Sequence, residues 1–149
     1  MKASAISKRI KSISTYKITI LGGDGFGGQK IFMAVMGDEV DIDLYYSTHW
    51  HPNISNPRNT KFLKIYKKLF KNEIPTSGAA FTFDLMNMLF KHKNIIQDPF
   101  FSTDILAKQI KKNFYETTSG FLKFKDDDNS PIKPIIMMSY KSGKYGLEK

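Results

Sequence analysis

The sequence predicts an α/β fold, and three observations lead to this class. Residues 16–21 alternate in polarity, are rich in β-branched side chains and run into a glycine-rich segment at 22–28, which is typical of a strand followed by a tight loop. The middle of the chain, 57–117, carries apolar residues at helical spacing. Strand-like runs return near the C-terminus. Helices and strands mixed in this way along a chain are characteristic of α/β domains.

The N-terminal part is expected to fold as helix, strand, loop, helix and strand. Ile6, Ile10 and Ile13 are spaced so that they share one face of an amphipathic helix. After the first strand and the glycine-rich loop, a short helix is expected at about 29–36. A second strand is expected at 40–46.

Three helices are expected in the middle of the chain. Residues 47–58 combine prolines with asparagines and serines, so they are predicted to form a linker. The first helix begins with Asn56 as its cap and Pro57 at its first position. The other two are expected at 75–91 and 102–117. The helix at 75–91 is the most apolar, so it should be the most buried.

The C-terminal part predicts a β-hairpin. Residues 121–124 and 135–140 are both strand-like. Between them, 126–131 is rich in turn-forming residues, which favours a hairpin with a long loop.

Composition narrows the possible functions. With 149 residues, 41% of them apolar, the chain is long enough for one core but short for two full domains. The absence of cysteine excludes disulfides, thiolate metal sites and cysteine nucleophiles. No apolar run reaches the roughly 18 residues of a membrane span, and the N-terminus lacks the continuous apolar stretch of a secretory signal.

The net charge of +9 raises the question of nucleic-acid binding. The lysines are scattered along the whole chain, and the only arginines are Arg9 and Arg58. Because arginine is the favoured reader of base edges and phosphates, a lysine-rich solvated surface is the preferred interpretation, and no nucleic-acid partner is expected.

A glycine pattern keeps a nucleotide-binding enzyme open as the alternative function. Gly23-x-Gly25-x-x-Gly28 follows a predicted strand and precedes a predicted helix, as in a dinucleotide fingerprint. Asp41 and Asp43 lie near the distance expected for a ribose-binding acid. They stand at the start of the second strand, however, and not at its carboxyl end, so the pattern fits only in part.

Metal and catalytic signals are weaker. His49 and His51 could bind a metal only with a further ligand, and His92 is remote in the sequence. Residues 126–129 resemble part of a calcium loop but lack its glycine and its terminal glutamate, so a solvated turn is favoured. The sequence contains no recognisable nucleophile elbow or paired catalytic acids. No metal, no cofactor and no enzymatic activity are therefore expected.

Asp24 is a single acid among glycines at the carboxyl end of a predicted strand. Considered alone, it is best explained as a turn aspartate that bonds its own backbone. In open α/β sheets, however, ligands bind beyond the carboxyl ends of the strands, where an acid can pair with an ammonium group.

Three motifs occur in order along nearly the whole chain. They are Ile20-Leu-Gly-Gly-Asp-Gly-Phe26, then Asn56-Pro57…Phe62…Tyr66…Phe70…Pro75…Ala79-Ala80…Phe83-Asp84, then Gly120…Phe124…Lys133-Pro134. Their order and spacing resemble the type I periplasmic solute-binding proteins, the Leu/Ile/Val-binding receptors of branched-chain amino-acid ABC transporters.

The resemblance implies an incomplete type I periplasmic-binding-protein-like fold with Rossmann-like lobes. Residues 1–46 would form part of the second lobe, 47–58 a hinge, 59–119 the helical part of the first lobe, and 120–149 a hairpin that returns to the second lobe. The first half of the family has no counterpart here. This implies a truncated form whose uncovered apolar face favours self-association.

The resemblance also implies a function and a site. The chain would be a ligand-binding module for branched-chain amino acids or a similar small solute, periplasmic, with the membrane permease of an ABC transporter as partner. Asp24 matches the acid that pairs with the α-ammonium group of the ligand, and Gly23, Gly25 and Phe26 match the loop that shapes this wall of the cleft. Gly78 stands where the family often has an aromatic residue, so the resemblance does not define the pocket for the side chain of the ligand.

Overall fold

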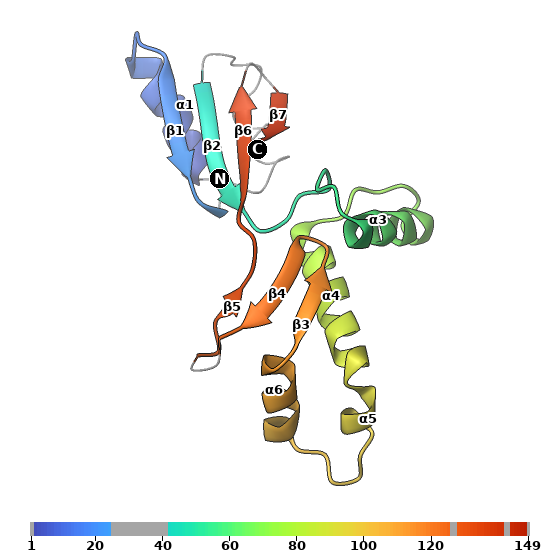
Figure 1. Cartoon of the computed structure of the whole chain (residues 1–149). Coiled ribbons are helices and arrows are strands. Elements are labelled where there is room, and N and C mark those ends of the chain that lie inside the picture. The colour runs from blue at the N-terminus through green and yellow to red at the C-terminus, as the bar shows by residue number, and fades with distance from the viewer. Residues whose placement is uncertain (1, 25–41, 126–127, 142–143, 149) are drawn as a thin grey trace. The chain divides into compact units, whose positions relative to one another are not determined.

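The computed structural model describes residues 2–24, 42–125, 128–141 and 144–148, and the structural statements below concern these residues. The chain divides into two compact units. We call Met1–His49 with Ile135–Lys149 the terminal unit, and Trp50–Pro134 the central unit (Figure 1). Each unit is described by itself.

The terminal unit consists of one described helix and a sheet in the order β1-β2-β6-β7. Strand β1 pairs with β2 in parallel, whereas β2 with β6 and β6 with β7 are antiparallel. The elements are α1 (Lys2–Ile13), β1 (Ile18–Gly22), β2 (Ile42–Thr48), β6 (Ile136–Lys141) and β7 (Lys144–Leu147).

The core of the terminal unit lies on the two central strands. Leu44 is paired with Tyr140 and Tyr46 with Met138, and all four side chains are buried. Because alternate residues of a strand point to the same face, these pairs form one apolar layer. Ile20 packs against it from β1.

Helix α1 confirms the amphipathic helix predicted from the isoleucine spacing. On its apolar face, Ile6, Ile10 and Ile13 are exposed. The predicted second strand is also confirmed, and it runs on to Thr48.

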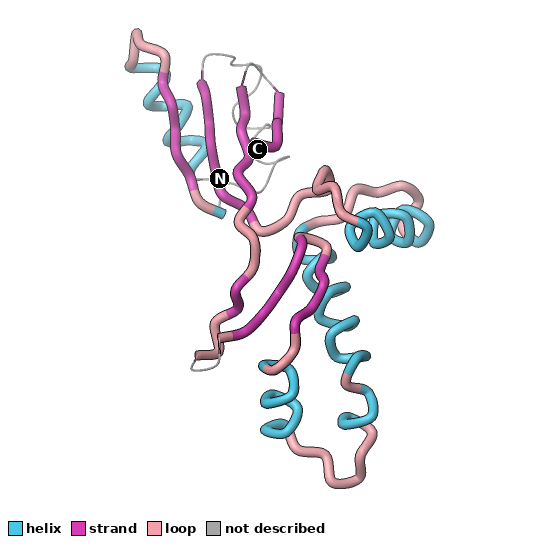
Figure 2. Tube along the Cα trace, in the orientation of Figure 1, coloured by secondary structure: helices cyan, strands magenta, loops and turns pink. Residues whose placement is uncertain are grey.

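The central unit contains helices followed by a small antiparallel sheet in the order β3-β4-β5 (Figure 2). The helices are α3 (Pro57–Leu69), α4 (Ser77–Lys91), α5 (Lys93–Ile96) and α6 (Thr103–Lys111). The strands are β3 (Phe114–Thr117), β4 (Gly120–Phe124) and β5 (Pro131–Ile132).

The core of the central unit is aromatic and includes a residue of the predicted linker. Trp50 is buried against Phe62 of α3, with ring centroids 6.0 Å apart in an edge-on arrangement. Phe62 also contacts Phe83 of α4 at 5.1 Å. The predicted cap is confirmed, because the Asn56 side chain accepts a hydrogen bond from the Asn59 amide at 2.8 Å.

The predicted C-terminal hairpin is wrong. Strand β4 pairs with β3 and β5, whereas β6 pairs with β2 and β7, so the two runs belong to different sheets. The loop after β4 does close a short pairing, but with Pro131–Ile132. Residues 120–134 therefore lie in the central unit, not with the last strands. Local periodicity identifies strands but cannot identify their partners.

The predicted third helix is too long at its C-terminal end. Helix α6 stops at Lys111, and 114–117 forms strand β3. The chain then turns through Thr118 and Ser119, and Thr117 pairs with Gly120. Gly120 has a φ of 127°, a conformation that favours glycine.

Helix α4 is not the buried helix that its composition predicts. Only Ala80 is fully buried, while Phe81, Leu85, Met86 and Phe90 are exposed. The described central unit covers the side of α4 that carries Ala80 and leaves much of the apolar remainder in solvent.

Some predictions fall outside the described residues, notably the helix at 29–36 and the first part of the acidic turn at 126–129. The assignment of units to lobes stays a prediction. Within the described part of the chain, no helix has the length and apolar character needed to cross a bilayer.

Candidate functional site

The predicted ligand-binding acid lies at the carboxyl edge of the terminal sheet. Because β1 and β2 are parallel, with Gly22 beside Tyr46, both strands end at the same edge. Gly23 and Asp24 directly follow β1, and Thr48 ends β2. This edge is where open α/β sheets bind ligands.

Asp24 is exposed at this edge, as is Gly23. Among the described residues, no donor or cation contacts the Asp24 carboxylate. A Cβ atom at Gly23 would meet no described atom within 4 Å, so the backbone there is open to a ligand. Gly25 and Phe26, the other two predicted contacts, lie outside the described residues.

The acid required by the nucleotide-binding alternative is placed at the wrong end of its strand. Asp43 lies beside Thr19 and forms an ion pair with Lys17 at 2.9 Å. At about 3.3 Å per residue, it is roughly 16 Å along the strand from Thr48. A ribose at the carboxyl edge would be out of its reach, which disfavours this alternative. Gly25, Gly28 and Asp41 lie outside the described residues.

The histidines that suggested a metal have other surroundings. His51 Nδ1 accepts a hydrogen bond from the Asn53 amide at 3.2 Å, and burial lowers the pKa of His51. His92 Nε2 lies 2.7 Å from the Tyr115 hydroxyl in a buried contact. No cluster of three or more metal-binding side chains occurs in the parts of the chain that the structure describes.

The central unit contains a half-buried carboxylate, Asp84, to which sequence reasoning gave no role. Both oxygens of Asp84 accept from the Thr118 amide at 3.0 Å, and Oδ2 also accepts from the Thr118 hydroxyl at 2.7 Å. Burial raises the pKa of Asp84, and the hydrogen bonds from Thr118 and the charge of Arg58 oppose this rise. The bonds tie α4 to the turn between β3 and β4.

A second polar network ties the segment after Trp50 to α3. Asn59 is fully buried, accepts from Trp50 Nε1 at 2.9 Å and donates to the Pro52 and Ile54 carbonyls at 3.0 and 2.9 Å. Asn56 donates to the Thr118 carbonyl at 2.8 Å. The predicted linker is thus a fixed part of the central unit from Trp50 onward.

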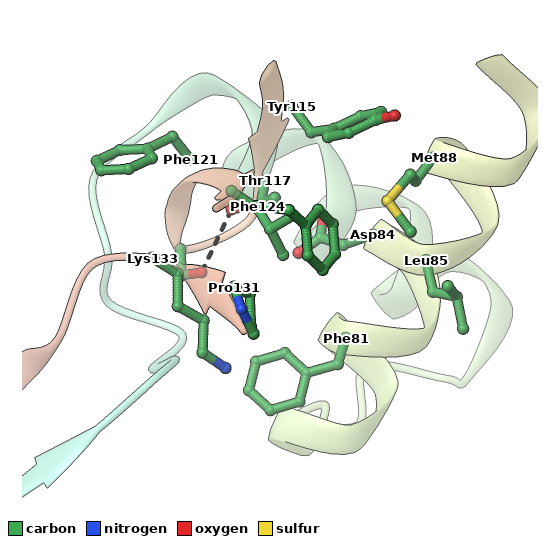
Figure 3. A pocket seen from close by; sticks show the side chains of 12 residues that line it. Phe81, Asp84, Leu85, Met88, Tyr115, Thr117, Phe121, Phe124, Pro131 and Lys133 are labelled. Carbon is green, nitrogen blue, oxygen red and sulfur yellow. Dashed lines mark hydrogen bonds between the residues drawn. The ribbon is translucent and has the colours of Figure 1, made fainter. Parts of the chain in front are cut away.

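A cavity of about 320 Å³ opens beside the Asp84 contact (Figure 3). Phe81 and Leu85 of α4 lie on one side and Phe121 of β4 on the other. The Lys133 ammonium group lies 4.9 Å from the centroid of the Phe81 ring, at a cation–π distance. The cavity suits an apolar group, whereas the Asp24 edge suits a cation.

The sequence matches no protein-family model, and a search of curated proteins found no relative. Solved structures do match. The leucine-binding protein LivK of Thermotoga maritima is 25% identical, with a TM-score of 0.77 over 99% of this chain and 41% of that chain.

Two further structures agree with this match. An ABC transporter substrate-binding protein from Desulfitobacterium hafniense, solved in complex with Leu, is 16% identical, with a TM-score of 0.75 over 98% of this chain and 40% of that chain. An ABC transporter solute-binding protein from R. palustris, in complex with benzoate, is 19% identical, with a TM-score of 0.65 over 86% of this chain and 34% of that chain.

These matches confirm at the level of the fold the resemblance that the three motifs predicted. They extend over almost the whole of this chain but less than half of each solved protein. The chain therefore has the α/β fold of the type I periplasmic solute-binding proteins, and it spans about two fifths of the length of the leucine-binding structures that it matches.

Proposed function

We propose that this chain is a ligand-binding module of an ABC-transporter solute-binding protein and that it binds an amino acid of the branched-chain type. The proposed role is binding, not catalysis. The proposed partner is the permease of the transporter, and the proposed location is the periplasm. The role, the partner and the location are all proposed because the similar solved structures are transporter solute-binding proteins.

One observation carries the proposal. Asp24 presents an exposed carboxylate, without a described partner, at the carboxyl edge of parallel strands in the fold of leucine-binding proteins. A carboxylate in this place can pair with the α-ammonium group of an amino acid through charge-assisted hydrogen bonds. The glycine beside it lets a ligand approach the backbone.

Because Asp24 is exposed, we expect the chain by itself to have a low affinity for leucine. An ion pair in solvent contributes about 0.2–1 kcal/mol, because water screens it. A pair enclosed on all sides is worth more, and losing one partner then costs about 2–5 kcal/mol. The chain alone should therefore bind leucine weakly, with a Kd of about 1 mM.

Ligand-observed saturation-transfer NMR with L-leucine tests the role of Asp24, since it detects weak binding. Asp24→Asn removes the charge and keeps the shape. We expect it to weaken leucine binding by up to about fivefold, which corresponds to about 1 kcal/mol. Asp104→Asn, which removes an exposed carboxylate in α6, should leave binding unchanged. Equal effects of the two substitutions would remove Asp24 from the site.

A further inference from the structure

A second cavity of the central unit, of about 350 Å³, is lined by residues of α3, α4 and β3. Two cations border it, Arg58 of α3 and Lys91 of α4. All of its lining residues belong to the central unit, whereas Asp24 belongs to the terminal unit. A concave site with a few converging polar groups is typical of small-ligand binding.

Both cations are positioned by aromatic rings. The Arg58 guanidinium group lies 5.8 Å from the centroid of the Phe83 ring, and the Lys91 ammonium group lies 4.9 Å from that of Tyr115. These are cation–π distances. Lys91 also donates to the Phe114 carbonyl at 3.4 Å. Within the described ranges, neither cation forms an ion pair with a carboxylate.

Arg58 has a donor that the described residues do not use. Its Nε atom is buried and has no hydrogen-bond partner among them. A buried N–H group without an acceptor is costly, so its position beside a cavity indicates that an acceptor binds there.

Two carboxylates also border the cavity, but they leave both cations available. The charge of Arg58 acts on Asp84, yet the Asp84 oxygens accept hydrogen bonds from Thr118. Glu116 is exposed, so water screens its charge.

The two cations are too far apart along α4 for one small acid group. Lys91 follows Phe83, the residue in contact with Arg58, by eight residues, which is about 12 Å of helix. The Lys91 side chain leans back toward the start of the helix, which shortens this gap. A short chain with a carboxylate at each end matches such an arrangement.

We propose that this cavity binds a small dicarboxylate, with one carboxylate on Arg58 and the other on Lys91. The planar guanidinium fork matches the geometry of a carboxylate, and Arg58 Nε supplies one of the donors. The site is independent of the proposed amino-acid site at Asp24.

The probe is succinate, titrated into the ¹⁵N-labelled full chain at constant ionic strength. Arg9 and Arg58 are the only arginines, so two Nε–H signals report on the guanidinium groups. Succinate should shift the Arg58 signal in a saturable way and leave the Arg9 signal unchanged. Acetate, with one carboxylate, should bind at least about threefold more weakly, since it loses one exposed ion pair.

Substitutions test the two cations separately, with the Asn87 amide signal as readout. Arg58→Gln should weaken succinate binding at least about tenfold, because it removes a half-buried charge. Lys91→Gln should weaken it about threefold to fivefold, since Lys91 is exposed. Lys68→Gln is the matched control, because Lys68 is an exposed lysine in the last turn of α3, as Lys91 is in that of α4.

Three results would overturn the proposal: no saturable shift of the Arg58 signal with succinate, equal effects of Lys91→Gln and Lys68→Gln, or acetate or inorganic phosphate binding as tightly as succinate. Circular dichroism verifies that each variant is folded. If Arg58→Gln does not fold, Lys91→Gln and the comparison of succinate with acetate still decide.

Discussion

Asp84 illustrates how a single half-buried residue can join two elements. Its carboxylate accepts hydrogen bonds from both the amide and the hydroxyl of Thr118, and these bonds join α4 to the turn between β3 and β4. In the sequence, Asp84 lies within the predicted helix at 75–91 and carries no predicted role. Its partner, 34 residues away, could not be predicted, because a turn that follows an unrecognised strand has no local signature.

Burial of Asp84 predicts a specific pH dependence of stability. The folded pKa of Asp84 is raised by burial, so between the unfolded and folded pKa values the folded state holds more protons. The stability contributed by this group is therefore full below about pH 4, the unfolded value, and is lost as the pH rises through the folded pKa. The Asp84→Asn variant lacks this pH-dependent change in stability, because its amide does not ionise.

Urea unfolding followed by the fluorescence of Trp50, the single tryptophan, measures the effect. The unfolding free energy of the wild type minus that of Asp84→Asn should fall as the pH rises from 3.5 to 7 in steps of about half a unit. Asp104→Asn reports the effect of removing a carboxylate from the surface. A difference that grows with pH would mean that the hydrogen bonds from Thr118 outweigh burial.

Position 120 requires a glycine, because of the backbone conformation there and because a neighbouring side chain leaves little room for a Cβ atom. Its φ is 127°, and a Cβ atom there would lie 3.1 Å from Pro134 Cγ. Gly120→Ala should destabilise the central unit by about 1–3 kcal/mol in urea unfolding. Gly78→Ala is the matched control, because a Cβ there would meet Thr76 Oγ1 at 3.7 Å. It should be neutral or stabilising by up to about 1 kcal/mol. Similar losses for both glycines would contradict this account.

At the scale of elements, the segment 50–56 is held in place by the side chain of Asn59. Asn59→Ala would leave Trp50 Nε1 and the Pro52 and Ile54 carbonyls without their partner. We expect a loss of about 2–4 kcal/mol in unfolding free energy, because buried polar groups without partners are costly. Asn94→Ala, at an exposed position in α5, should change it by less than about 0.5 kcal/mol. A loss below 1 kcal/mol for Asn59→Ala would show that water replaces these bonds.

The elements that the sequence predicted well are those with a local cause. Helix α3 begins where the Asn56-Pro57 cap predicts, and β1 ends at the glycines. Strand β3 was missed because 114–117 directly follows a helix and carries no turn signal. The hairpin was misplaced because the acidic turn formers at 126–131 suggested a link between strands that pair elsewhere.

At the scale of the whole molecule, the resemblance carried more information than periodicity did. The ordered motifs predicted the fold that the solved structures confirm. Of the predicted site, the position of Asp24 at a strand end followed from the sequence, because glycines mark that end. Gly25 and Phe26, the other predicted contacts, lie outside the described residues, and a local sequence pattern does not identify the groups that distant segments bring to the same edge of a sheet.

The apolar surface also belongs to this scale. Exposed isoleucines on α1, and Phe81 and Leu85 of α4, show that the two units each carry exposed apolar side chains. Such surface agrees with the predicted tendency to self-associate, which stays a prediction.

The most direct test of the central claim is an NMR titration of the ¹⁵N-labelled chain with leucine and two analogues. 3-Methylbutylamine keeps the ammonium group and lacks the carboxylate, whereas 4-methylpentanoate keeps the carboxylate and lacks the ammonium group. If Asp24 pairs with the ammonium group of the solute, leucine and the amine should shift the Gly23 and Asp24 amide signals in a saturable way, and 4-methylpentanoate should not. Equal shifts with both analogues, or none with leucine at concentrations above about 10 mM, roughly ten times the expected Kd, would contradict the claim.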